Sequence, residues 1–232
     1  MISENAVIHE NVVLGKGCII EDFAVIGAPL AGDEKHPPTT IGEGAVIRSH
    51  TVIYAGNRIG KNFQTGNKAN IREFNVIGDD VSIGTLSVVE HHVEIENGVR
   101  IHSQVFVPEY CRLMEGAWIG PNAVLTNARY PKTRHTKERL EGVIVGKGAK
   151  IGANSTVLPG VRIGDGALVG AGSVVTRDVD DLAITFGNPS RRIGWVCQCG
   201  LPLRGMEENV LGCDDCGRSY RAAEGRLYPT TP

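Results

Sequence analysis

The chain has 232 residues, a formal net charge of −2 and 22% charged residues, which fits one large domain or a medium domain with an appendage. A hydrophobic share of 41% excludes disorder as the main state, and the near-neutral charge argues against nucleic acid as the main partner. There is no apolar run long enough to cross a bilayer. The first ten residues lack the basic start and apolar block of a secretory signal. We therefore expect a cytoplasmic protein that has no membrane partner.

A six-residue period runs through most of the chain. An aliphatic residue recurs at every sixth position from Ile2 to Ile26, from Ile41 to Leu125 and from Val145 to Val175, with Thr65 as the exception. Six residues make about 1.67 helical turns, so a helix would scatter these side chains around its surface. In a strand, residues separated by an even number share one face. We therefore predict short strands joined by corners, with three repeats, or 18 residues, forming one coil of a three-sided column.

This pattern resembles the left-handed parallel β-helix of hexapeptide-repeat acyltransferases, over residues 2 to about 178. The resemblance implies an all-β triangular prism, to which we assign residues 1–184. The predicted register can be checked by charge, because residues 18 apart would stack in adjacent coils. Two predicted neighbours then have opposite charges, Arg72 with Glu90 and Glu94 with Arg112.

Two stretches interrupt the repeat and are predicted to be loops, residues 31–40 and residues 127–142. The second is basic, and long loops on rigid scaffolds often carry function. It contains Arg129 and Tyr130, which we consider candidates for substrate contact. The alternative is a solvated loop that only packs on a neighbouring subunit.

The predicted stacking places His91 between Glu73 and Glu109, with Asn127 in the next coil. A histidine exposed near a corner beside carboxylates can act as a general base, because a carboxylate fixes its tautomer and stabilises the imidazolium. The alternative is a surface histidine in a ladder of charges. The resemblance favours catalysis, since acyltransferases of this fold have their catalytic histidine at this repeat position. It also implies that a backbone N–H at or beside Glu109 polarises the thioester carbonyl.

Two other histidines lie near this stretch. His92 falls between Phe74 and Tyr110 in its column, so we interpret it as an aromatic packing residue. His102 is a reserve candidate for the base, ranked lower because its column holds no acidic neighbour.

Residues 118–131 and 187–195 narrow the resemblance to enzymes that N-acetylate amino sugars carried on a nucleotide diphosphate. These include the 3-amino-glucuronate acetyltransferases of surface-polysaccharide pathways. In that subfamily an asparagine meets the sugar amine, and Ser103 and Gln104 occupy the matching positions here. They are therefore our candidates for substrate binding, together with Asn127.

The resemblance also implies that acetyl-CoA lies along the prism between two subunits of a homotrimer, beside the last coils. The residues implied for pantetheine contacts are Gly152, Ala153, Gly170 and Ala171. Arg191 and Arg192 are candidates for the coenzyme phosphates, because guanidinium groups suit phosphate oxygens. The alternatives are that the glycines only form corners and that the arginines are solvated charges.

The composition changes near the C-terminal end, where we predict a connector at residues 185–194 and a zinc-ribbon-like module at residues 195–228. Two short clusters, each followed by glycine, supply four cysteines: Cys197, Cys199, Cys213 and Cys216. Four thiolates suit a structural, tetrahedral zinc site. Disulfides are the alternative, which a reducing compartment disfavours.

The sequence thus predicts acetyl transfer from acetyl-CoA to the amine of a nucleotide-linked amino sugar. O-acetylation of a sugar hydroxyl by the same residues is the second hypothesis. A noncatalytic β-helix scaffold is the third. A carbonic anhydrase relative is disfavoured, because the histidines lack the spacing for a shared metal.

Overall fold

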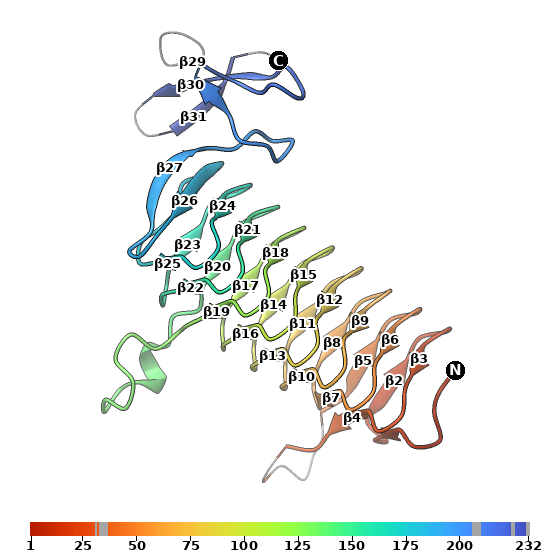
Figure 1. The fold of residues 1–232 in the computed structure, drawn as a ribbon. Helices are drawn as coiled ribbons and strands as arrows, with labels where there is room; N and C mark the ends of the chain where they lie inside the picture. The colour runs from red at the N-terminus through yellow and green to blue at the C-terminus, as the bar shows by residue number, and fades with distance from the viewer. Residues whose placement is uncertain (31, 33–36, 206–209, 224–225, 231–232) are drawn as a thin grey trace.

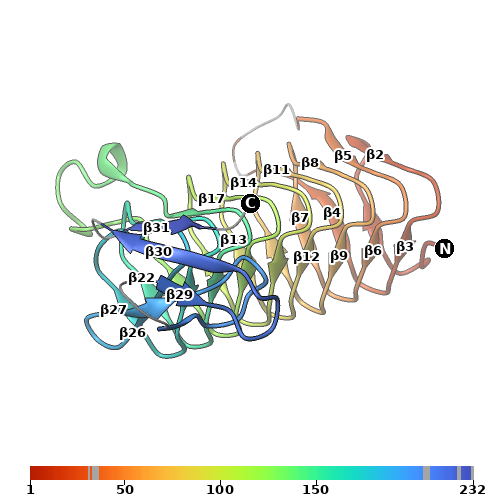
Figure 2. The ribbon, with the colours of Figure 1, turned by 90° about the horizontal axis from the view of Figure 1, so that it is seen from above.

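The computed structural model describes residues 1–30, 32, 37–205, 210–223 and 226–230. Within these residues the chain winds into a column of stacked parallel strands, with a small antiparallel sheet at its C-terminal end (Figures 1 and 2). The predicted left-handed parallel β-helix is confirmed. Part of the first predicted loop, residues 31 and 33–36, lies outside the described residues.

The column has three faces, each a ladder of short strands. The first face contains β1 (Val7–Ile8), β4 (Val25–Ala28), β7 (Val52–Tyr54), β10 (Asn70–Ile71), β13 (Val88–Val89), β16 (Phe106–Val107), β19 (Val124–Leu125), β22 (Thr156–Val157) and β25 (Val174–Val175). The second face contains β2 (Val12–Leu14), β5 (Thr39–Ile41), β8 (Arg58–Ile59), β11 (Val76–Ile77), β14 (Glu94–Ile95), β17 (Arg112–Leu113), β20 (Ile144–Val145) and β23 (Arg162–Ile163). The third face contains β3 (Ile19–Ile20), β6 (Val46–Ile47), β9 (Gln64–Thr65), β12 (Ser82–Ile83), β15 (Arg100–Ile101), β18 (Trp118–Ile119), β21 (Lys150–Ile151), β24 (Leu168–Val169), β26 (Ala183–Phe186) and β27 (Arg191–Trp195).

The register of 18 residues is observed directly. Val89 pairs with Ile71 in the coil before it and with Val107 in the coil after it. The two charge pairs used to check the register also form. Arg112 lies 2.7 Å from a Glu94 carboxylate oxygen, and Arg72 lies 3.7 Å from one of Glu90.

The interior of the column is filled by the aliphatic residue of each repeat. In a typical two-residue strand the first side chain points outward and the second is buried, as in β13 and β16. Thr65, the exception in the sequence, is also buried. Its hydroxyl accepts a hydrogen bond from the Arg48 backbone N–H at 2.9 Å and contacts the Thr51 hydroxyl at 3.2 Å. The polar atom is therefore satisfied, and the coil keeps its register.

Both interruptions occur at the edge between the first and second faces. The first separates β4 from β5, and the second separates β19 from β20. Because of the second, Arg112 pairs with Ile144 instead of a residue 18 positions later. This excursion projects from the column and contains the short 3₁₀ helix η1 (Lys137–Arg139) (Figure 1).

The C-terminal end of the column is closed by a hairpin. β26 pairs in parallel with β24, and β27 returns antiparallel to β26. The segment expected as a connector, residues 185–194, thus extends the third face as an antiparallel hairpin. The last coil is two residues shorter than the others, since Leu168 pairs with Ile184.

A four-stranded antiparallel sheet follows the hairpin. It consists of β28 (Arg204–Gly205), β29 (Val210–Gly212), β30 (Ser219–Ala223) and β31 (Arg226–Pro229). Leu203, Leu211 and Leu227 pack against the core of the column, so the sheet covers its end. Among the described residues, no helix has the length and apolar character needed to span a membrane.

Candidate active site and metal site

One edge of the column carries the predicted catalytic residues. We call it the histidine edge, and it consists of Glu73, His91, Glu109 and Asn127 between the first and second faces. His91 Nε2 lies 3.7 Å from Glu109 Oε1. Asn127 Nδ2 donates a hydrogen bond to Glu109 Oε2 at 2.6 Å, which holds the carboxylate beside the imidazole. The structure therefore brings these three side chains together.

Glu73, in the preceding coil, is held mainly by Arg72. The Arg72 guanidinium donates hydrogen bonds to both Glu73 carboxylate oxygens, at 2.8 and 3.0 Å. Burial alone would raise the pKa of Glu73, but these hydrogen bonds and the Arg72 and His91 charges lower it below its ordinary value. Glu73 is thus an anion that faces His91 while being neutralised by Arg72.

His91 also makes a contact that the sequence did not suggest. Its Nδ1 lies 2.8 Å from Nδ1 of His92. The His92 ring lies between Phe74 and Tyr110, with ring centroids 5.2 and 5.9 Å away. The predicted aromatic packing of His92 is confirmed, but the ring also forms a hydrogen bond with the candidate base.

The candidate substrate and coenzyme residues lie elsewhere. We call their location the glycine edge, which consists of Ser103, Gln104, Gly152, Ala153, Gly170 and Ala171 between the third and first faces. Ser103 and Gln104 are exposed. The whole first face separates this edge from the histidine edge, so one chain does not bring the two sets of candidates together.

Close stacking explains two of the candidate glycines. A Cβ on Gly152 would lie 2.5 Å from the Ala171 backbone nitrogen, and a Cβ on Gly170 would lie 2.7 Å from the Phe186 ring. Both positions therefore exclude larger residues for reasons of packing. This does not conflict with a role in binding, because the same glycines leave the backbone accessible at the edge.

The candidate arginines differ in how far they are engaged. Arg192 Nη1 lies 3.1 Å from Asp180 Oδ2, and its guanidinium stacks 4.6 Å from the centroid of the Trp195 ring. Arg191 is exposed and donates a hydrogen bond to the Ser190 carbonyl at 2.9 Å. Both belong to β27 at the end of the third face.

In the excursion after β19, Arg129 donates a hydrogen bond to the Pro159 carbonyl at 2.9 Å, which ties the base of the excursion to the column. Tyr130 is 69% exposed. Of these two candidates, Tyr130 is the one whose side chain is open to a partner molecule.

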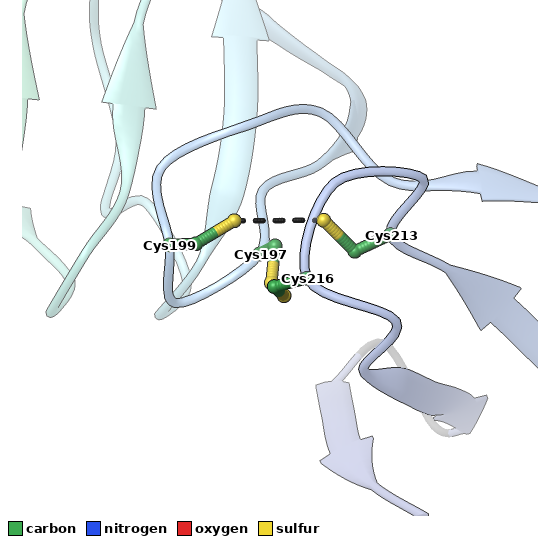
Figure 3. A group of neighbouring side chains, drawn as sticks. All are labelled: Cys197, Cys199, Cys213 and Cys216. Carbon is green, nitrogen blue, oxygen red and sulfur yellow. Dashed lines mark hydrogen bonds between the residues drawn. The ribbon is translucent and has the colours of Figure 1, made fainter.

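The four cysteines predicted as metal ligands converge (Figure 3). Their sulfur atoms all lie within 4.8 Å of one another. Cys197 and Cys216 are 3.5 Å apart, as are Cys199 and Cys213. Zinc–sulfur bonds of about 2.3 Å in a tetrahedron would place sulfur atoms about 3.8 Å apart. The donor set therefore fits a zinc ion in both type and spacing.

A buried tyrosine supports this cluster. The Tyr220 hydroxyl lies 3.2 Å from Cys197 Sγ and accepts a hydrogen bond from the Gln198 backbone N–H at 3.2 Å. Burial would raise the pKa of the Cys197 thiol, but hydrogen bonds from Tyr220 and neighbouring groups lower it to about 6. Sequence spacing gave no sign of Tyr220, which reaches the cysteines through the pairing of β29 with β30.

Comparisons with known proteins agree with the repeat. Residues 76–109 and 142–177 match the family described as bacterial transferase hexapeptide (six repeats). The chain is 40% identical over 82 residues to dTDP-3-amino-3,6-dideoxy-alpha-D-galactopyranose 3-N-acetyltransferase of Aneurinibacillus thermoaerophilus. This match covers 35% of the chain and 42% of the relative, so it spans less than half of that enzyme.

Solved structures support the fold. The UDP-N-acetylglucosamine acyltransferase of Francisella novicida is similar with a TM-score of 0.57 and 21% identity, over 84% of this chain and 70% of that one. A Bacillus cereus protein is similar with a TM-score of 0.52 and 20% identity, over 76% of this chain and 86% of that one. The repeat, the column and the family match together identify the chain as a member of the hexapeptide-repeat family.

Proposed function

We propose that the protein transfers an acetyl group from acetyl-CoA to the amine of a nucleotide-linked amino sugar. The observation that carries this proposal is the outward-facing His91 beside Glu109, on the column of an acyltransferase family. The substrate class rests on the 40% identity to a dTDP-amino-sugar N-acetyltransferase.

In the proposed reaction, the neutral sugar amine attacks the thioester carbonyl carbon and a C–N bond forms. His91 Nε2 accepts the proton that leaves the nitrogen, and the tetrahedral intermediate collapses with loss of the coenzyme A thiolate, which then takes up a proton. Glu109, 3.7 Å from Nε2, would stabilise the imidazolium. Much of the rate acceleration would come from holding the amine and the thioester in line.

We further propose that the site is completed by a neighbouring subunit. The histidine and glycine edges lie on opposite sides of the first face, so a second copy is needed to bring a histidine edge against a glycine edge. The first face is suited to such contact because its outward residues are mostly aliphatic or aromatic: Val25, Val52, Val88, Phe106, Val124 and Val174. Its rows also contain the polar Asn70 and Thr156.

The second face has a different outward row. Arg58, Glu94, Arg112 and Arg162 point outward there. Charged residues are depleted in the buried centre of interfaces, whereas aromatic residues are enriched. We therefore infer that the first face is the subunit interface of a homotrimer, with acetyl-CoA lying along the glycine edge and its phosphates near Arg191 and Arg192.

The cysteine cluster is proposed to hold a structural zinc ion. All four of its ligands would be cysteines, which leaves no open position for catalysis. The metal would fix the C-terminal module, residues 195–228, against the end of the column. A cytoplasmic location would follow, because a reducing compartment keeps the four thiols available to metal.

The experiment is a thiol-release assay with acetyl-CoA and a panel of UDP- and dTDP-linked amino sugars, together with the matching sugars that have a hydroxyl in place of the amine. We expect release of free thiol with at least one amino sugar. Turnover with the hydroxyl sugars alone would show O-acetylation instead. Absence of both turnover and acetyl-CoA binding would indicate a noncatalytic scaffold.

A further inference from the structure

The contact between His91 and His92 imposes a proton arrangement on the pair. The two Nδ1 atoms lie 2.8 Å apart, and a hydrogen bond at that distance needs one N–H donor and one lone-pair acceptor. The rings meet edge to face, with an interplanar angle of 87°. Exactly one of the two Nδ1 atoms therefore carries the proton that they share.

The role of His91 as a base decides which ring donates. An imidazole that accepts a proton at Nε2 must already carry its proton on Nδ1. The contact from His91 Nε2 to Glu109 is 3.7 Å, which is longer than a hydrogen bond, so it does not fix a proton on Nε2. When His91 is protonated both ring nitrogens become donors, and Nδ1 still requires an acceptor. His92 Nδ1 can fill that place in both states of the base only if His92 is neutral with its proton on Nε2.

His92 is well held for this task. It occupies a left-handed corner with φ of 56°, and its backbone N–H donates to the Glu73 carbonyl at 3.3 Å. Phe74 and Tyr110 contact its ring from the coils on either side. The groups that face it are therefore the His91 ring, the Tyr110 ring and the Glu73 backbone.

We propose that His92 is a positioning residue that holds His91 in the tautomer with Nδ1 protonated and Nε2 free to accept a proton. This inference rests on the proposed acetyl transfer by His91. It gives His92 a chemical role in addition to aromatic packing. A histidine tautomer set by the partner of its other nitrogen is a general feature of catalytic histidines.

Two substitutions separate the hydrogen bond from the packing. His92→Phe keeps an aromatic ring and removes the acceptor, and Phe23 and Phe74 already adopt φ of 61° and 60° at equivalent corners. His92→Asn restores an acceptor oxygen near the place of Nδ1, and asparagine tolerates the left-handed region. His50→Phe is a matched control, because His50 has φ of 60° and its ring packs 5.1 Å from Phe23 at another edge.

The first measurement is nitrogen-15 NMR of the imidazoles in the substrate-free protein, which does not depend on activity. We expect the proton on Nδ1 of His91 and on Nε2 of His92. A His91 ring with its proton on Nε2 would overturn the inference. If no sugar is acetylated, the proposed function fails separately, and this spectrum still reports the tautomers.

The second measurement is the kinetics of thiol release. We expect His92→Phe to lower kcat by about 10-fold or more, His92→Asn to recover most of that loss, and His50→Phe to match the wild type. Equal rates for wild type and His92→Phe, or equal losses in His92→Phe and His92→Asn, would overturn the positioning role.

Discussion

Replacing Val124 with glutamate is expected to separate the subunits. Val124 points outward from β19 in the first face and is 37% exposed in the single chain. Full burial of a valine side chain contributes about 1.5–3 kcal/mol, so covering the remaining third would contribute about 0.5–1 kcal/mol. An unpaired carboxylate at the same place adds a desolvation cost of several kcal/mol. A sum of about 4 kcal/mol weakens each interface about 1000-fold.

Multi-angle light scattering after size-exclusion chromatography measures this directly. We expect a trimer for the wild type and a monomer for Val124→Glu at micromolar concentration, with loss of acetyl transfer. Val76→Glu is the matched control, because Val76 points outward from β11 in the second face and is 41% exposed. A wild-type monomer, or a Val124→Glu variant that stays trimeric, would refute the assignment of the first face as the interface.

Three further predictions concern the site and the C-terminal module. His91→Ala is expected to lower kcat by roughly 100-fold or more with little change in acetyl-CoA affinity, measured by thiol release and by calorimetry; an unchanged kcat would remove His91 from the mechanism. The lowered pKa of Glu73 means that its ion pair stabilises the fold above the ordinary pKa of 4.5 and is lost as the pH falls through the lowered value. The Tm of wild type should therefore exceed that of Glu73→Gln at pH 7 and converge with it in acid, and a gap that persists in acid would contradict this. Elemental analysis should find about one zinc per chain, absent in Cys213→Ser, and Tyr220→Phe should weaken metal affinity by about 10-fold; equal affinity would deny Tyr220 that role.

The fold could be predicted because the repeat is written in every coil. A period of six with aliphatic residues is incompatible with a helix and compatible with strands, and stacking at 18 residues then follows. The same arithmetic placed His91 beside Glu109 before any coordinates were considered. These predictions succeed because parallel stacking converts sequence distance directly into position.

What the arithmetic could not give is the direction of side chains within a column. It placed His92 between Phe74 and Tyr110, yet the contact between His92 and His91 depends on two ring rotamers at one corner. It also could not show that the candidates for catalysis and for coenzyme binding lie on separate edges until each was assigned to a corner. Tyr220 escaped prediction because antiparallel pairing in a short module has no period to follow.

The closing hairpin at the C-terminal end has a consequence for how copies of the chain can associate. A parallel ladder normally ends in a strand with unpaired backbone groups, which can recruit another chain and lead to fibres. Here β27 turns antiparallel to β26, and its two-residue shortfall breaks the spacing that a following coil would need. Growth along the axis is thereby blocked at this terminus, and lateral contact through the flanks remains the route to a closed, finite assembly.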